Sequence, residues 1–150
     1  MLRRRRVIGD ALIADGDKQM LENFPLTALV TTLSLAVYLW VTLKVGGARA
    51  KHGVKAPNID GPPEFQRVFR VQQNTLEQLA LYVPVQWIFA AAWGDVAAAA
   101  VGALWPIGRI LYALSYYQAA EKRGAGFGIT FLSSAVLLIG SLVGAVMKLI

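Results

Sequence analysis

The sequence predicts an all-α membrane protein, a bundle of four transmembrane helices. Hydrophobic residues make up 56% of the 150 residues, which is more than the roughly half found in soluble domains. Two runs without a charge, residues 24–43 and 125–147, each supply the ~20 apolar residues that a spanning helix needs. Two further apolar stretches, 79–93 and 96–120, lie between them, and Arg109 is the only charge inside the second.

The spans follow one another with short connections. The first is expected near residues 23–47 and the last near 126–149. The middle two become long enough if each helix continues into the polar sequence at its far end, which gives spans near 64–93 and 96–122, joined by a tight turn at 93–95. Residues 23–150 then form the membrane domain. Residues 1–22 are predicted to be a disordered or non-native extension; in the non-native version the true start is Met20.

The charges predict which way the spans are oriented. The loop after the third span carries Lys122 and Arg123, whereas the turn between the middle spans carries only Asp95. The loop after the first span carries four cations: Lys44, Arg49, Lys51 and Lys55. Because basic loops stay in the cytoplasm, the polar ends of the middle spans are expected to meet there. The net charge of +6 is thus explained by topology and anionic headgroups, without nucleic acid.

The composition also excludes several kinds of site. The sequence has no cysteine and a single histidine, His52. Disulfides, cysteine nucleophiles and thiolate metal sites are therefore absent, and one histidine cannot build a two-histidine zinc site. The glycine-rich segment 124–128 does not follow a strand, so we expect a flexible hinge there instead of a dinucleotide-binding loop.

Polar side chains form a stripe on each middle span. At about 100° per residue, four residues of the second span fall within an arc of about 80°: Arg67, Arg70, Asn74 and Glu77. Four residues of the third segment fall within an arc of about 60°: Arg109, Tyr112, Tyr116 and Arg123. Facing stripes would form a polar cavity at the cytoplasmic end. Arg109, surrounded by apolar sequence, needs a carboxylate partner, either Glu77 or an anionic ligand.

Alternatives remain at this point. Arg49, Arg67 and Lys122 lie near helix ends, where a long cationic side chain can reach the headgroups without serving a site. Arg70 and Glu77 could instead contribute to structural pairs between helices. If the stripes do form a site, arginines suit carboxylates and the glutamate suits an ammonium group. A peptide-like molecule with two carboxylates, an amine and a thiol fits, although the stripes by themselves would also admit an organic anion carrier.

Two segments resemble the signatures of a known family. Residues 61–77, GPPEFQRVFRVQQNTLE, are similar to the second span of the MAPEG proteins (membrane-associated proteins in eicosanoid and glutathione metabolism). Residues 108–116, GRILYALSY, followed by Arg123, resemble the third span of the same family. The likeness runs from about Arg49 to Arg123, roughly half of the chain.

The resemblance implies a homotrimer that binds glutathione between neighbouring subunits, on the cytoplasmic side, and needs no metal. Arg123 would stabilise the glutathione thiolate, and Arg109 would be structural or ligand-binding. The other residues that match glutathione ligands of the family are Arg49, Arg70, Gln72, Asn74, Glu77, Tyr112 and Tyr116.

The implied activity is that of a microsomal-type glutathione transferase, a glutathione-dependent peroxidase, or both. The second substrate would be a lipophilic electrophile or a lipid hydroperoxide arriving from the membrane lipid. Ala50 and Gln78 replace an arginine and a tyrosine of the leukotriene-forming synthases, and Ala50 argues against leukotriene synthesis. A non-catalytic lipid-binding scaffold, like the lipoxygenase-activating branch of the family, is the alternative, followed by a small anion transporter. The Ala- and Gly-rich composition favours a bacterial inner membrane over the endoplasmic reticulum.

Overall fold

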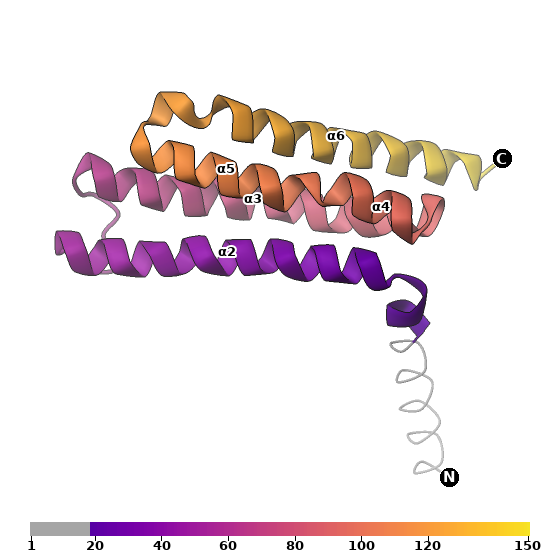
Figure 1. The fold of residues 1–150 in the computed structure, drawn as a ribbon, viewed down its shortest axis with the longest axis horizontal. Coiled ribbons are helices and arrows are strands. Elements are labelled where there is room, and N and C mark those ends of the chain that lie inside the picture. Colours follow the sequence, from indigo (N-terminus) through magenta and orange to yellow (C-terminus); the bar gives the residue numbers. More distant parts are fainter. Residues whose placement is uncertain (1–18) are drawn as a thin grey trace, which may run out of the picture.

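The computed structural model describes residues 19–150, which form helices that lie side by side (Figure 1). Residues 19–23 are helical and precede the first long helix. The helices that follow are α2 (Pro25–His52), α3 (Pro63–Trp93), α4 (Asp95–Gly102), α5 (Leu104–Gln118) and α6 (Gly124–Met147), with a 3₁₀ turn η1 (Ala120–Arg123) before α6. Except for 19–22, the extension predicted for residues 1–22 lies outside the described residues. The tightest pairings are α5 with α6, α2 with α3 and α3 with α6.

Three of these helical segments have the length and apolar composition to cross a membrane. They are α2, the combined α4–α5 segment and the combined η1–α6 segment. Helix α3 has 31 residues, but its first half is polar, so a crossing by α3 remains a prediction. The outer faces carry large apolar side chains such as Leu39, Leu43, Phe131 and Leu142, all more than half exposed. Such faces need lipid or neighbouring protein to cover them.

Helix α2 begins at Pro25, whose fixed φ suits the first helical position. The backbone N–H groups of Leu26 and Thr27 donate to the Asp95 carboxylate at 2.9 and 2.7 Å. A carboxylate at a helix N-terminus satisfies free donors and complements the helix dipole. Asp95, in the turn between α3 and α4, therefore caps α2 from another part of the chain. Helix α2 continues past the predicted end at 47 and stops at Gly53, which has a φ of 67°.

The third predicted span differs from the expectation of one helix over 96–122. It is interrupted at Ala103 and ends at Gln118, after which the chain makes the 3₁₀ turn η1. Pro106 has no N–H, so the helical hydrogen bond to the Gly102 carbonyl cannot form. The buried Tyr82 hydroxyl donates to that carbonyl instead, at 3.0 Å. The interruption is thus stabilised by α3.

Small residues let α6 pack closely on α3. A Cβ atom added at Gly140 or Gly144 would overlap the side chains of Phe89 or Ala92. Hydrogen bonds reinforce the contact, because the Trp93 indole N–H donates to the Gly140 carbonyl at 2.8 Å. Gly140 and Gly144 therefore form a close helix contact, as expected for small residues at membrane helix interfaces.

The prediction of a flexible hinge at 124–128 is wrong, because α6 begins at Gly124 and is helical throughout this segment. A Cβ atom at Gly126 would overlap the backbone of Tyr112 and would lie 2.8 Å from the Gly108 carbonyl oxygen. Glycine is needed here because two helix backbones touch. This contact holds the start of α6 against the part of α5 that carries Arg109 and Tyr112.

Candidate functional site

A polar cavity of about 410 Å³ opens where α3, α5 and the start of α6 meet. Five of the predicted site residues line it: Asn74, Glu77, Arg109, Tyr112 and Arg123. The prediction that the two polar stripes face each other is therefore confirmed for these residues. These five residues bring two guanidinium groups, a carboxylate, an amide and a phenol into one cavity.

Arg109, Asn74 and Tyr112 hold one another in position. The Asn74 side-chain amide donates to the Tyr112 hydroxyl at 2.7 Å, and an Arg109 Nη2 group donates to the Asn74 backbone carbonyl at 2.7 Å. The Arg109 guanidinium carbon lies 4.5 Å from the ring centroid of Tyr112 and 5.7 Å from that of Trp105. Such cation–π contacts also hold the Arg109 guanidinium in place. The guanidinium is thereby locked to both α3 and α5.

Arg109 nevertheless keeps unused donors. It is 1% exposed, and its Nε and Nη1 atoms are buried without a hydrogen-bond partner among the described residues. Of the two partners considered for Arg109, Glu77 or an anionic ligand, Glu77 makes no ion pair with it. The only ion pair within residues 19–150 joins Glu64 and Arg67, at 3.4 Å. An uncompensated buried charge is costly. An anion in the cavity would lower that cost.

Arg123 reaches the cavity by a route that the helical spacing does not predict. It ends η1 and does not continue α5. Its Nη1 group donates to the Tyr116 hydroxyl at 3.4 Å, and its guanidinium carbon lies 5.5 Å from the Tyr116 ring centroid. The side chain is exposed. A charged donor is thus held at the cavity rim and remains accessible.

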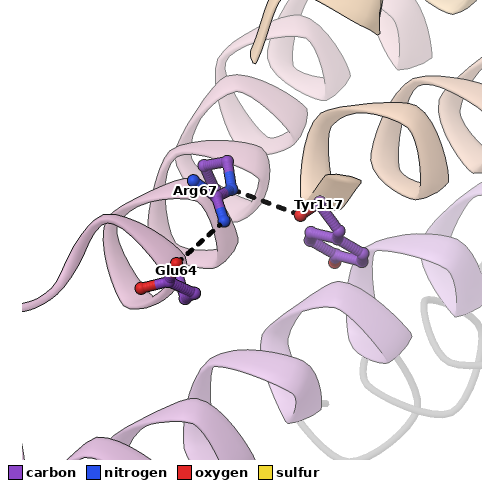
Figure 2. A network of polar contacts seen from close by, with 3 residues as sticks. All are labelled: Glu64, Arg67 and Tyr117. Atoms are coloured by element: carbon purple, nitrogen blue, oxygen red, sulfur yellow. Dashed lines mark hydrogen bonds and ion pairs between the residues drawn. The ribbon is translucent and has the colours of Figure 1, made fainter. Parts of the chain in front are cut away.

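Arg70 and Tyr116 line a neighbouring hollow of about 400 Å³. Arg67, which also lines it, is engaged by the protein: its Nε group donates to the Tyr117 backbone carbonyl at 3.2 Å, and it pairs with Glu64 (Figure 2). Arg70 is exposed and lies one helical turn before Asn74. The two hollows therefore follow each other along α3.

Arg49 and Gln72 are not brought to this cavity within one chain. The Arg49 Nη1 group donates to the Asn58 backbone carbonyl at 2.7 Å, and its guanidinium carbon lies 5.4 Å from the Phe65 ring centroid. The Gln72 side-chain amide donates to the Tyr38 hydroxyl of α2 at 2.9 Å. Both are directed toward the α2 side of α3. One chain thus places the predicted ligands on more than one face.

The structure adds cavity residues that the stripes did not include. Gln78, Gly124 and Phe127 complete the lining, and Trp105 packs against Arg109. Trp105 could have been found, because it precedes Arg109 by four residues and so shares its helix face. Phe127 could not, because its position depends on the backbone contact between α5 and α6. Within residues 19–150 there is no cluster of His, Cys, Asp or Glu suited to a metal ion.

Comparisons with known proteins agree on one family. The sequence pattern that defines the MAPEG family matches residues 27–143. An uncharacterized protein of Synechocystis sp. is 50% identical over 122 residues, which cover 81% of this chain and 89% of that protein. Human microsomal glutathione S-transferase 2 is 38% identical over 126 residues, or 84% of each chain. Leukotriene C4 synthase of Cavia porcellus is 34% identical over 104 residues, or 69% of each chain.

Proposed function

Because the chain belongs to the MAPEG family, we propose that this integral membrane protein is a glutathione transferase acting on lipophilic electrophiles. We propose glutathione-dependent reduction of lipid hydroperoxides as a second reaction of the same site. Relatives named microsomal glutathione S-transferase and leukotriene C4 synthase support glutathione as the co-substrate. Ala50, where the leukotriene-forming synthases carry an arginine, argues against a leukotriene product.

The observation that carries the proposal is the buried Arg109, which lines the polar cavity and has two donor atoms without a hydrogen-bond partner in the described part of the chain. Glutathione carries two carboxylates, one amine and one thiol. Guanidinium groups bind carboxylates through paired, charge-assisted hydrogen bonds. The Glu77 carboxylate, in the same cavity, suits the amine. The positive and negative side chains that line the cavity therefore complement the carboxylates and the amine of glutathione.

Arg123 is the residue that we assign to activation of the sulfur. A free thiol has a pKa of about 8.5, so only a few per cent of it is thiolate at neutral pH. A permanently charged guanidinium beside the sulfur favours the anion, and each unit of pKa depression corresponds to about 1.4 kcal/mol. The Tyr116 hydroxyl, which accepts a hydrogen bond from Arg123, orients the guanidinium.

The two reactions share this thiolate. In the transferase reaction the sulfur electron pair forms a bond to an electrophilic carbon, and the leaving group departs with its own electron pair. In the peroxidase reaction the sulfur attacks the terminal oxygen of the hydroperoxide, and the alkoxide leaves and takes up a proton. A second glutathione then converts the sulfenic acid to a disulfide and releases water. No protein cysteine is needed, which suits a chain that has none.

We further propose that the working assembly is a homotrimer in which each site uses two chains. Arg49 and Gln72 are directed away from the cavity that contains Arg123. In a ring of identical subunits, one face of each chain meets a different face of its neighbour. Arg49 and Gln72 would then complete the cavity of the next subunit.

Replacing Arg123 with alanine tests the assigned role. The variant should bind glutathione but lose most turnover, because the thiolate loses its counter-charge. The ultraviolet thiolate absorbance that appears when glutathione is added to wild-type protein is the direct measurement. Lys122→Ala, which removes the neighbouring exposed cation, is the control and should retain both signals. An Arg123→Ala variant with the wild-type thiolate absorbance would show that the assignment is wrong.

The same preparation separates an enzyme from a lipid-binding scaffold. Purified protein is assayed with glutathione and either a generic aryl halide or a lipid hydroperoxide. We expect turnover that depends on glutathione and on Arg123. A protein that binds lipid but turns over neither substrate would be a scaffold.

A further inference from the structure

A second surface of the molecule lies between α2 and α5 and shares no lining residue with the glutathione cavity. It begins as an apolar groove of about 490 Å³, lined by Val30, Val37 and Trp40 of α2 and by Pro106 and Ile110 of α5, among others. Every residue that lines it is nonpolar. From Val30 to Trp40 helix α2 rises about 15 Å, which is half of the ~30 Å hydrocarbon thickness of a bilayer. The groove therefore has the length of one leaflet.

The groove continues into a polar hollow at Trp40, which lines both. This hollow, of about 680 Å³, also includes Lys44, Lys51, Glu64 and Tyr117. The rings of Trp40 and Tyr117 meet edge to face with centroids 6.3 Å apart. Tryptophan and tyrosine favour the depth at which headgroups begin. The surface thus changes from apolar to basic where a lipid changes from chain to headgroup.

The charge of the hollow is positive. Glu64 is already paired with Arg67 at 3.4 Å (Figure 2). Lys44 and Lys51 are exposed and make no ion pair within residues 19–150. Both lysines are therefore available to an anion at this end of the groove.

Tyr117 adds an unused polar group. Its hydroxyl oxygen is buried and has no hydrogen-bond partner among the described residues, although buried hydroxyl groups are normally satisfied. The backbone beside it is fixed, because the Tyr117 carbonyl accepts from Arg67, and its ring lies toward α2 (Figure 2). Tyr117, a residue that lines the basic hollow, thus has a hydroxyl group without a hydrogen-bond partner among the described residues.

We propose that this continuous surface binds one anionic phospholipid. One acyl chain occupies the groove between α2 and α5, and the phosphate lies between Lys44 and Lys51. The lipid comes from the leaflet on the basic side of the protein. The proposal does not depend on the reaction catalysed at the other cavity.

Two adjacent glycines provide a matched test. A Cβ atom added at Gly46 or Gly47 would meet nothing within 4 Å, but only Gly47 lines the polar hollow. Gly47→Phe should therefore fill the hollow, whereas Gly46→Phe adds the same side chain outside it. Lys44→Gln combined with Lys51→Gln removes the charge without adding bulk, and Lys122→Gln is the control for charge.

The measurement compares two lipids with brominated acyl chains, which quench tryptophan fluorescence on contact. Wild-type protein in phosphatidylcholine vesicles receives either brominated phosphatidylglycerol or brominated phosphatidylcholine, and Trp40→Phe identifies the signal of Trp40. We expect phosphatidylglycerol to quench Trp40 at about tenfold lower concentration. The preference should disappear in the double lysine variant and weaken in Gly47→Phe, but persist in Gly46→Phe and Lys122→Gln.

Three results would overturn the proposal. Equal quenching by the two lipids would mean that ordinary surrounding lipid covers the groove. A preference that survives the double lysine variant would mean that the anion binds elsewhere. Absence of Trp40 quenching by either lipid would mean that a second copy of the chain covers this face.

Discussion

Arg109 shows how one side chain can serve both the fold and the ligand. Its Nη2 group is used by the Asn74 carbonyl, and its planar face is covered by Tyr112 and Trp105. Its remaining Nε and Nη1 atoms have no hydrogen-bond partner within residues 19–150. A guanidinium fixed in this way loses little freedom when a carboxylate arrives, so more of the hydrogen-bond energy is available as affinity.

Glu77 is the residue for which the proposal makes the clearest affinity prediction. Glu77→Gln keeps the shape of the side chain but removes the charge that the glutathione amine would need. Because hydrogen bonds to charged groups contribute about 1.5–3 kcal/mol, glutathione affinity should fall by about tenfold or more. Titration calorimetry of the purified protein measures this. Glu64→Gln, which removes the carboxylate paired with Arg67, should leave the affinity unchanged, and an unchanged Glu77→Gln variant would make Glu77 a packing residue only.

At the scale of the helices, the site depends on how closely α6 approaches α5. Gly126 lies against the Tyr112 backbone and near the Gly108 carbonyl, so the helix backbones themselves are in contact. Arg123 and Gly124 precede this contact directly, and Arg109 and Tyr112 lie on its other side. Any added atom at the contact must move backbone, and the two walls of the cavity would separate.

Gly126→Ala tests this contact. The added methyl group should lower the stability by about 1–3 kcal/mol, the usual cost of overpacking, and should weaken glutathione binding as the cavity widens. Gly128→Ala is the matched control, because its Cβ meets nothing within 4 Å and alanine favours a helix by up to ~1 kcal/mol. Thermal unfolding in detergent should therefore rank Gly128→Ala at or above wild type and Gly126→Ala below it. Equal midpoints for the two variants would contradict the contact.

The sequence predicted most of these elements because hydrophobic runs and helical spacing report local structure. The stripe of Asn74 and Glu77 and the stripe of Arg109 and Tyr112 do face each other, as the 3.6-residue repeat requires. The hinge prediction was wrong because a glycine in a flexible loop and a glycine at a backbone contact look alike in sequence. The interruption at Ala103 was missed although Pro106 is visible, because its stabilisation depends on Tyr82 of another helix.

At the scale of the whole molecule, one chain does not bring all of the predicted ligands together. Asn74, Glu77, Arg109, Tyr112 and Arg123 share a cavity, whereas Arg49 and Gln72 bond elsewhere. Helical spacing assigns residues to faces of one helix but contains no information about neighbouring chains. This division is what a site shared between subunits requires.

Sharing of the site can be tested by mixing two inactive variants. Arg49→Ala and Arg123→Ala should each be inactive alone if both side chains serve the same site. When the two are co-expressed, a subunit with intact Arg123 can meet a neighbour with intact Arg49. A cyclic trimer that contains both variants has one interface of its three that combines the two intact residues, so turnover should recover to about a third of wild type. Differently tagged chains, purified in sequence, ensure that only mixed assemblies are assayed. Mixed assemblies without activity would place Arg49 and Arg123 in the same subunit's site, and an active Arg49→Ala variant would place Arg49 outside the site. Either result would reject the shared site.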